Sequence, residues 1–138
     1  MRPIYETAKD RQREDEVRQY LIETYKCDYK KTAVLSGVDG YLYYPDDRVA
    51  AVVEIKCRNN AHDKYPTYMI SANKWRNANV LAKDDGVPFL LVVKFTDGIY
   101  AIKGDKEHPV AMGGRYDRGD AQDVEECMYI PLEHFKKI

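Results

Sequence analysis

Hydrophobic residues recur along this chain with two different periods, and these periods predict helices and strands in alternation. Between residues 8 and 26 the spacing is three and four residues, which marks one face of a helix. That face consists of Val17, Tyr20, Leu21, Thr24 and Tyr25. The segment contains neither glycine nor proline and opens with Thr7-Ala8-Lys9-Asp10, so we predict a first helix from there to about Lys26.

Two β-prone runs follow the helix, at 38–43 and 49–58. They flank Tyr44-Pro45-Asp46-Asp47, where proline pre-sets φ for the second turn position and the aspartates suit the positions after it. We therefore predict an antiparallel hairpin. Side chains alternate across a strand, so Val52, Glu54 and Lys56 share one face of the second run, and Val53, Ile55 and Cys57 share the other.

This hairpin brings charged side chains together at the rim of an apolar sheet. Asp39 lies at the end of the first run that is away from the turn, so antiparallel pairing returns it alongside Glu54 and Lys56. Charges in such surroundings are costly unless a cation or an anionic substrate engages them. Two close carboxylates suit Mg²⁺, and a neighbouring lysine can hold a phosphate oxygen or orient an attacking water. The pattern therefore predicts a divalent-cation site beside a lysine.

The remaining long elements again alternate between helix and strand. Ser71 is placed to cap a second helix, from about Ala72 to Lys83, which ends at Asp85-Gly86. The nearly continuous apolar run Val87–Phe95 is typical of a central strand covered on both faces. The next run, Ile99–Lys103, completes a second hairpin. This order predicts the α/β class, with a mixed central β-sheet flanked by helices.

Shorter segments complete the prediction. They are a basic loop at 26–31, a strand at 32–35, an irregular polar segment at 59–68, a strand at Cys127–Pro131 and a short helix at Leu132–Lys137. His62, in the irregular segment, is either a proton shuttle or a solvated loop residue. Trp75, in the second helix, is either a core residue or a base-stacking platform.

Composition and charge narrow the class of protein. A chain of 138 residues with 44% hydrophobic content is expected to form one domain, spanning 1–138. The formal net charge is −1, so any contact with nucleic acid depends on local basic patches. Three widely spaced cysteines without a CxxC pair argue against a disulfide framework or a zinc site. The sequence shows no signal peptide and no long apolar stretch, so we expect no membrane partner and a cytoplasmic protein.

The order of the charged motifs resembles a known group of enzymes. Asp39 followed by Glu54-Ile55-Lys56 resembles the signature of the PD-(D/E)XK nuclease superfamily. With Glu14-Asp15-Glu16-Val17 before it and Gly86–Phe95 after it, the chain is similar to the archaeal Holliday junction resolvase branch of that superfamily. The resemblance implies a restriction-endonuclease-like core. The end of the chain departs from the resolvase pattern and is similar in general character to small phage-encoded nucleases.

The resemblance also implies a set of site residues. Glu14, Asp39 and Glu54 would form the acidic metal site together with Ile55, and Lys56 would be the catalytic lysine. The reaction would be hydrolysis of DNA phosphodiester bonds with Mg²⁺, for which Mn²⁺ would substitute, leaving a 5′-phosphate. From the residues alone Glu14 has a second interpretation, because it lies one turn before Val17 and can pair with Arg18 at i+4.

The DNA substrate stays open at this point. Resolvases of this kind are strongly basic dimers, whereas this chain is nearly neutral. A nicking or end-processing nuclease is therefore an alternative to a junction-specific enzyme, and a non-catalytic nucleic-acid-binding module with the same fold is another. In each case the expected partner is duplex or branched DNA, and a homodimer would suit symmetric cutting of two strands.

Basic side chains near the predicted site or in loops are the candidate DNA contacts: Lys30, Lys31, Arg58, Lys74, Arg115 and Arg118. Lys30 and Lys31 belong to the basic segment after the first helix, for which a solvated loop is the alternative. Arg115 and Arg118 lie in the glycine-rich stretch 112–120, where pairing with neighbouring aspartates is the alternative.

Overall fold

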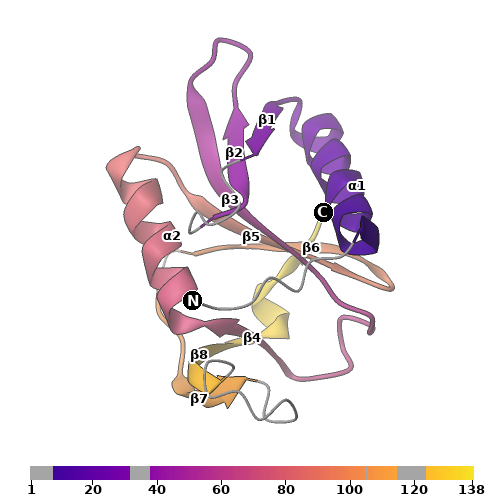
Figure 1. The fold of residues 1–138 in the computed structure, drawn as a ribbon, viewed down its shortest axis with the longest axis vertical. Coiled ribbons are helices and arrows are strands. Elements are labelled where there is room, and N and C mark those ends of the chain that lie inside the picture. The colour runs from indigo at the N-terminus through magenta and orange to yellow at the C-terminus, as the bar shows by residue number, and fades with distance from the viewer. Residues whose placement is uncertain (1–7, 32–37, 105, 115–123) are drawn as a thin grey trace.

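A six-stranded mixed sheet is the centre of the protein. The computed structural model describes residues 8–31, 38–104, 106–114 and 124–138. The sheet has the order β1-β2-β3-β5-β6-β9, and β3 and β5 are its one parallel pair (Figure 1). Its strands are β1 (Asp28–Lys31), β2 (Gly40–Tyr43), β3 (Val49–Cys57), β5 (Phe89–Phe95), β6 (Gly98–Lys103) and β9 (Lys136–Lys137).

Two helices cover opposite faces of this sheet, as Figure 1 shows: α1 (Ala8–Tyr25) and α2 (Ala72–Asp84). The alternation of β3 explains the two faces, because Val53 packs in the core beneath α1 and Val52 packs in the core beneath α2. Trp75 is fully buried in the α2 core, so it is a core residue and not an exposed stacking platform. The predicted fold class, a mixed sheet flanked by helices, is confirmed.

The predicted hairpin is confirmed as β2 and β3. They pair antiparallel, and the Asp47 N–H donates to the Tyr44 carbonyl at 2.9 Å across the turn. Asp47 has φ of +69°, a left-handed conformation that aspartate tolerates better than most residues. The second helix and its cap are confirmed too, since the Ser71 hydroxyl accepts from the Lys74 N–H.

Several predicted segments differ from the structure. The basic stretch 26–31 was predicted as a loop, but its last four residues form strand β1, because pairing with β2 satisfies their backbone. The strand predicted at 32–35 lies outside the described residues. The helix predicted at Leu132–Lys137 is only the 3₁₀ turn η2 (Leu132–His134), after which Lys136 pairs with Ala101 of β6.

A second, three-stranded sheet was not predicted. It has the order β4-β8-β7, with β4 at Thr67–Ser71, β8 at Val124–Pro131 and β7 at Val110–Gly114. It lies against one end of α2 (Figure 1) and buries Ile70, Met128 and Ile130 in the core on that side. The strand predicted at Cys127–Pro131 is confirmed as the larger part of β8.

The buried face of α1 is narrower than the predicted stripe. Val17 and Leu21 are fully buried, whereas Tyr20, Thr24 and Tyr25 are exposed. The Tyr20 hydroxyl donates to the Ile138 carbonyl at 2.7 Å, so this side chain lies over the edge of the core with its polar end outward. Within the described part of the chain, no helix combines the length and the apolar character that crossing a bilayer requires.

Candidate active site

Strand pairing places Asp39 directly beside Glu54. Gly40 pairs with Val53, and the Asp39 N–H extends this ladder by donating to the Val53 carbonyl at 3.1 Å. The carboxylate of Asp39 then accepts the Ile55 N–H at 2.6 Å. One backbone bond and one side-chain bond therefore fix Asp39 against β3, as the hairpin register predicts.

Glu54 is a buried carboxylate held by two lysines. Its side chain is 3% exposed, and its Oε1 lies 3.3 Å from Lys56 Nζ and 3.1 Å from Lys74 Nζ. Lys56 is two residues further along the same face of β3, and Lys74 belongs to the first turn of α2, which Ser71 caps. A buried carboxylate is tolerated because these two ammonium groups compensate its charge.

The electrostatics of the site follow from this crowding. Burial raises the pKa of Asp39, the charge of Glu54 raises it further, and the Ile55 N–H and the two lysines offset part of the rise. Burial works to lower the pKa of Lys56, but the carboxylates of Glu54 and Asp39 outweigh it and leave that pKa raised. Because the charge of Glu54 disfavours ionisation of Asp39, added positive charge at this site is stabilising.

The residues present suit a divalent cation. Asp39 and Glu54 supply carboxylate oxygens, the donors that Mg²⁺ prefers. Val53 and Ile55 both direct backbone groups toward Asp39, since the Val53 carbonyl accepts its N–H and the Ile55 N–H donates to its carboxylate. The carbonyl of Ile55 belongs to the same side of the strand, beyond the end of β2, and adds a third oxygen donor. This is the role in which Ile55 fits the predicted metal set.

Glu14 lies on the other face of the sheet. Its carboxylate is 3.8 Å from the guanidinium of Arg18, the i+4 pairing that the sequence offered as an alternative. Burial raises the pKa values of Tyr29 and Cys57, and the charge of Glu14 raises both further, which places Glu14 near these α1-side residues. The charge of Asp39 also raises the pKa of Tyr29.

Among the described residues, one group brings three ligand-type side chains within 4.8 Å of one another, and it consists of His62, Asp63 and Asp97. Glu14, Asp39 and Glu54 do not meet that spacing among the described residues. The Nδ1 of His62 lies 2.5 Å from Asp97 Oδ2, and its ring stacks on Tyr100 at 4.6 Å. His62 is therefore not a free loop side chain. It joins the loop after β3 to the β5–β6 turn.

The candidate DNA contacts have different surroundings. Lys30 lies over the ring of Tyr43 at 4.7 Å, and Lys31 is exposed at the end of β1. Arg58 is exposed immediately after β3, with its guanidinium hydrogen-bonded to the Tyr68 hydroxyl at 2.8 Å. Lys74 was predicted as a DNA contact, and the structure adds its ion pair with Glu54. Arg115 and Arg118 lie outside the described residues.

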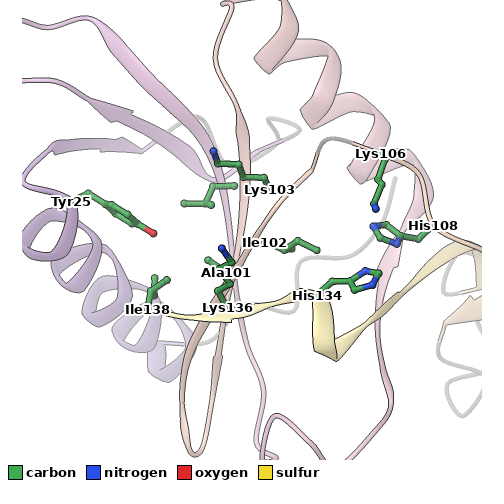
Figure 2. Close-up of a pocket in the computed structure, with 10 residues that line it drawn as sticks. Tyr25, Ala101, Ile102, Lys103, Lys106, His108, His134, Lys136 and Ile138 are labelled. Carbon is green, nitrogen blue, oxygen red and sulfur yellow. The ribbon is translucent and has the colours of Figure 1, made fainter.

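A cavity of about 480 Å³ is elsewhere on the sheet. It lies along β6 and β9, and Figure 2 shows Lys106, His108 and His134 together on one side of it. Its described lining includes three lysines and two histidines but no acidic side chain. Such a lining does not suit a hard divalent cation, so the site on β3 is the better candidate for one.

Comparisons with known proteins identify the family and the fold of the chain. Residues 1–138 match the family described as "Phage putative PDDEXK endonuclease". Among solved structures, the fold is similar to Hjc of Archaeoglobus fulgidus, a Holliday junction resolvase from an archaeal hyperthermophile. The TM-score is 0.57 at 13% sequence identity, over 88% of each chain. No curated protein matches the sequence.

Proposed function

The chain belongs to the phage PDDEXK endonuclease family, and from that premise we propose that it is a Mg²⁺-dependent deoxyribonuclease that hydrolyses DNA phosphodiester bonds. The observation that carries the proposal is the buried Glu54, held beside Asp39 and in contact with Lys56 and Lys74. The active unit is one domain formed by residues 1–138, and it acts in the cytoplasm of a prokaryotic or phage-infected cell.

In this proposal Asp39, Glu54 and the Ile55 carbonyl hold the cation. A divalent ion bound there would lower the pKa of a water and offset charge on the scissile phosphate. On binding the cation, Glu54 would lose part of its ion pairing with Lys56 and Lys74. The ammonium group freed in this way would be available to the substrate. Lys56 and Lys74 then bind phosphate oxygens and stabilise the negative charge that develops during hydrolysis. Glu14 remains a predicted outer member of the acidic set.

The substrate proposal is DNA that is duplex or branched. The fold shared with Hjc supports a resolvase-like geometry, and a homodimer would place two such sites on two strands. A nicking or end-processing enzyme is the alternative. A panel of four-way junction, flap, single-stranded and linear duplex DNA separates these, because a junction-specific enzyme cuts the first substrate preferentially.

Plasmid cleavage tests the activity itself. Purified protein is incubated with supercoiled plasmid in Mg²⁺, in Mn²⁺ and in EDTA, and we expect cutting in both metals and none in EDTA. Lys56→Ala should abolish cutting, whereas Lys94→Ala is a matched control because Lys94 is a similarly exposed strand lysine paired with Glu16. DNA binding without cutting in every ion would instead identify a non-catalytic module.

A further inference from the structure

A second cavity begins at Arg58, two residues beyond Lys56, and much of its lining is aromatic. It has a volume of about 400 Å³, within the range of pockets that hold small ligands. Its lining includes Arg58, Tyr65, Tyr68, Met69 and Tyr129. Tyr65 is 56% exposed, so its ring is accessible to a ligand.

Tyr68 connects this cavity to the acidic site. Its hydroxyl accepts a hydrogen bond from Arg58 Nη2 at 2.8 Å, and the same guanidinium lies over its ring at 5.0 Å. Burial raises the pKa of Tyr68 to about 12, with smaller effects from the charges of Arg58, Glu54 and Lys74. The hydroxyl therefore keeps its proton, and its hydrogen-bond partner Arg58 follows Lys56 by two residues at the end of β3.

Arg58 retains hydrogen-bonding capacity for a ligand. A guanidinium has five N–H donors. Among the described residues, one donor serves the Cys57 carbonyl and one serves Tyr68. The remaining donors suit a phosphate, which guanidinium groups bind in a two-pronged manner.

Backbone hydrogen bonds and aromatic contacts fix the residues that line the cavity. The Arg58 N–H donates to Lys94 at 2.8 Å, and Thr96 donates to Asn60 at 3.0 Å, so β5 and the turn after it fix the loop that carries Arg58. The ring of Tyr68 packs edge-on against Phe95 and Phe135. Pre-organised walls reduce the entropy lost on binding.

We propose that this cavity binds one unpaired nucleobase, while Arg58 binds the phosphate that joins that nucleotide to the cleaved bond. Stacking on tyrosine is tolerant of base identity and needs a base that has left its duplex. The preferred substrate is therefore DNA with an unpaired nucleotide beside the scissile phosphate, such as a flap, a single strand or the centre of a junction. This inference rests on the proposed nuclease function and deepens it.

Binding without cleavage is the first test. A single-stranded oligonucleotide containing 2-aminopurine is titrated with protein in EDTA, and stacking in the cavity should quench its fluorescence. Tyr65→Ala should weaken the affinity about tenfold, in the range of one lost base–aromatic stack. Tyr44→Ala is the matched control, because Tyr44 is 43% exposed and, like Tyr65 beneath Lys64, has a cationic side chain over its ring, that of Arg48 at 5.0 Å. Equal quenching by both variants would overturn the proposal.

Cleavage selectivity is the second test. Equal-length substrates, one fully paired and one with an unpaired nucleotide at the cut, are compared in Mg²⁺. Arg58→Ala should reduce the rate on the unpaired substrate about tenfold more than on the duplex. Arg48→Ala should leave that ratio unchanged.

The two tests separate this inference from the proposed function. If Arg58→Ala lowers the cleavage rate by the same factor on both substrates, the base-binding cavity is refuted but the proposed nuclease function is not. Quenching that depends on Tyr65, in a protein that cuts neither substrate, keeps the base cavity and refutes the nuclease.

Discussion

Two regions of this protein bring metal-binding side chains together, and they do so in different ways. At Asp39 and Glu54 the carboxylates belong to paired strands, one of them fully buried and in contact with two lysines. At His62, Asp63 and Asp97 the side chains are closer together but lie in loops, and the two aspartates are exposed. In the loop cluster, His62 and Asp97 are already hydrogen-bonded to each other.

The comparison shows that proximity of ligand atoms is a weak guide to a catalytic site. The exposed cluster already has a structural explanation, since it ties the loop after β3 to the turn after β5. In the strand site, burial and the charge of Glu54 disfavour the ionised form of Asp39. A bound cation would offset this unfavourable interaction, and an anionic substrate would pair with the lysines. The burial of Glu54 and its effect on the pKa of Asp39 therefore identify the candidate catalytic site better than the spacing of ligand atoms alone.

The largest expected effect comes from removing a carboxylate of the strand site. Asp39→Asn should lower Mg²⁺-dependent cleavage about 10³-fold, because several kcal/mol of charge stabilisation depend on the cation. Asp63→Asn, in the loop cluster, should retain wild-type activity. The measurement is the initial rate of plasmid nicking, and the reverse ranking would move the site to the loops.

The next effect concerns the backbone that carries Asp39. A Cβ at Gly40 would lie 2.6 Å from the Lys30 carbonyl oxygen and would also meet the Tyr29 ring. Gly40→Ala should therefore cost about 1–3 kcal/mol of unfolding free energy and reduce cleavage by displacing Asp39. Gly86→Ala, at φ of +67° in open space, is the control for backbone strain alone. It should lose stability in urea titrations but keep its cleavage rate.

A smaller effect is expected at the second lysine. Lys74 is 41% exposed and shares Glu54 with Lys56, so Lys74→Ala should reduce cleavage about tenfold. Lys74→Arg should recover part of the rate because it restores the positive charge. If Lys74→Ala affects DNA affinity and leaves the single-turnover rate unchanged, Lys74 binds DNA without assisting the chemistry.

The smallest effect distinguishes the two regions by the sign of their pH dependence. The bond to His62 lowers the pKa of Asp97, so its contribution to stability is present above the ordinary value of 3.8 and is lost as pH falls through the lower folded value. Burial and Glu54 raise the pKa of Asp39, so its contribution is present below 3.8 and is lost as pH rises through the higher folded value. Melting temperatures of Asp97→Asn and Asp39→Asn, relative to wild type in EDTA, should therefore change in opposite directions across mildly acidic pH. Parallel changes would show that the two sites have similar electrostatics.

Local signals in the sequence determined much of the fold. Alternation and the Tyr44–Asp47 turn predict the β2–β3 hairpin, and through its register they predict that Asp39 lies beside Glu54. Ser71 and Gly86 mark the ends of α2, and the apolar run 87–95 marks the buried central strand. Each of these follows from a period or a turn within a few residues, where backbone sterics and side-chain direction decide the outcome.

Only the tertiary structure decided the contacts between distant segments. The pairing of β4 with β8 joins residues about sixty positions apart, and neither strand has a turn signal that specifies its partner. The contact of Lys74 with Glu54 was also decided by the tertiary structure, because the residues around Lys74 suit a solvent-exposed helix position as well as pairing with a buried carboxylate. Packing of α2 on the sheet brings its ammonium group to Glu54, because burial of Trp75 and Ala78 sets the rotation of the helix.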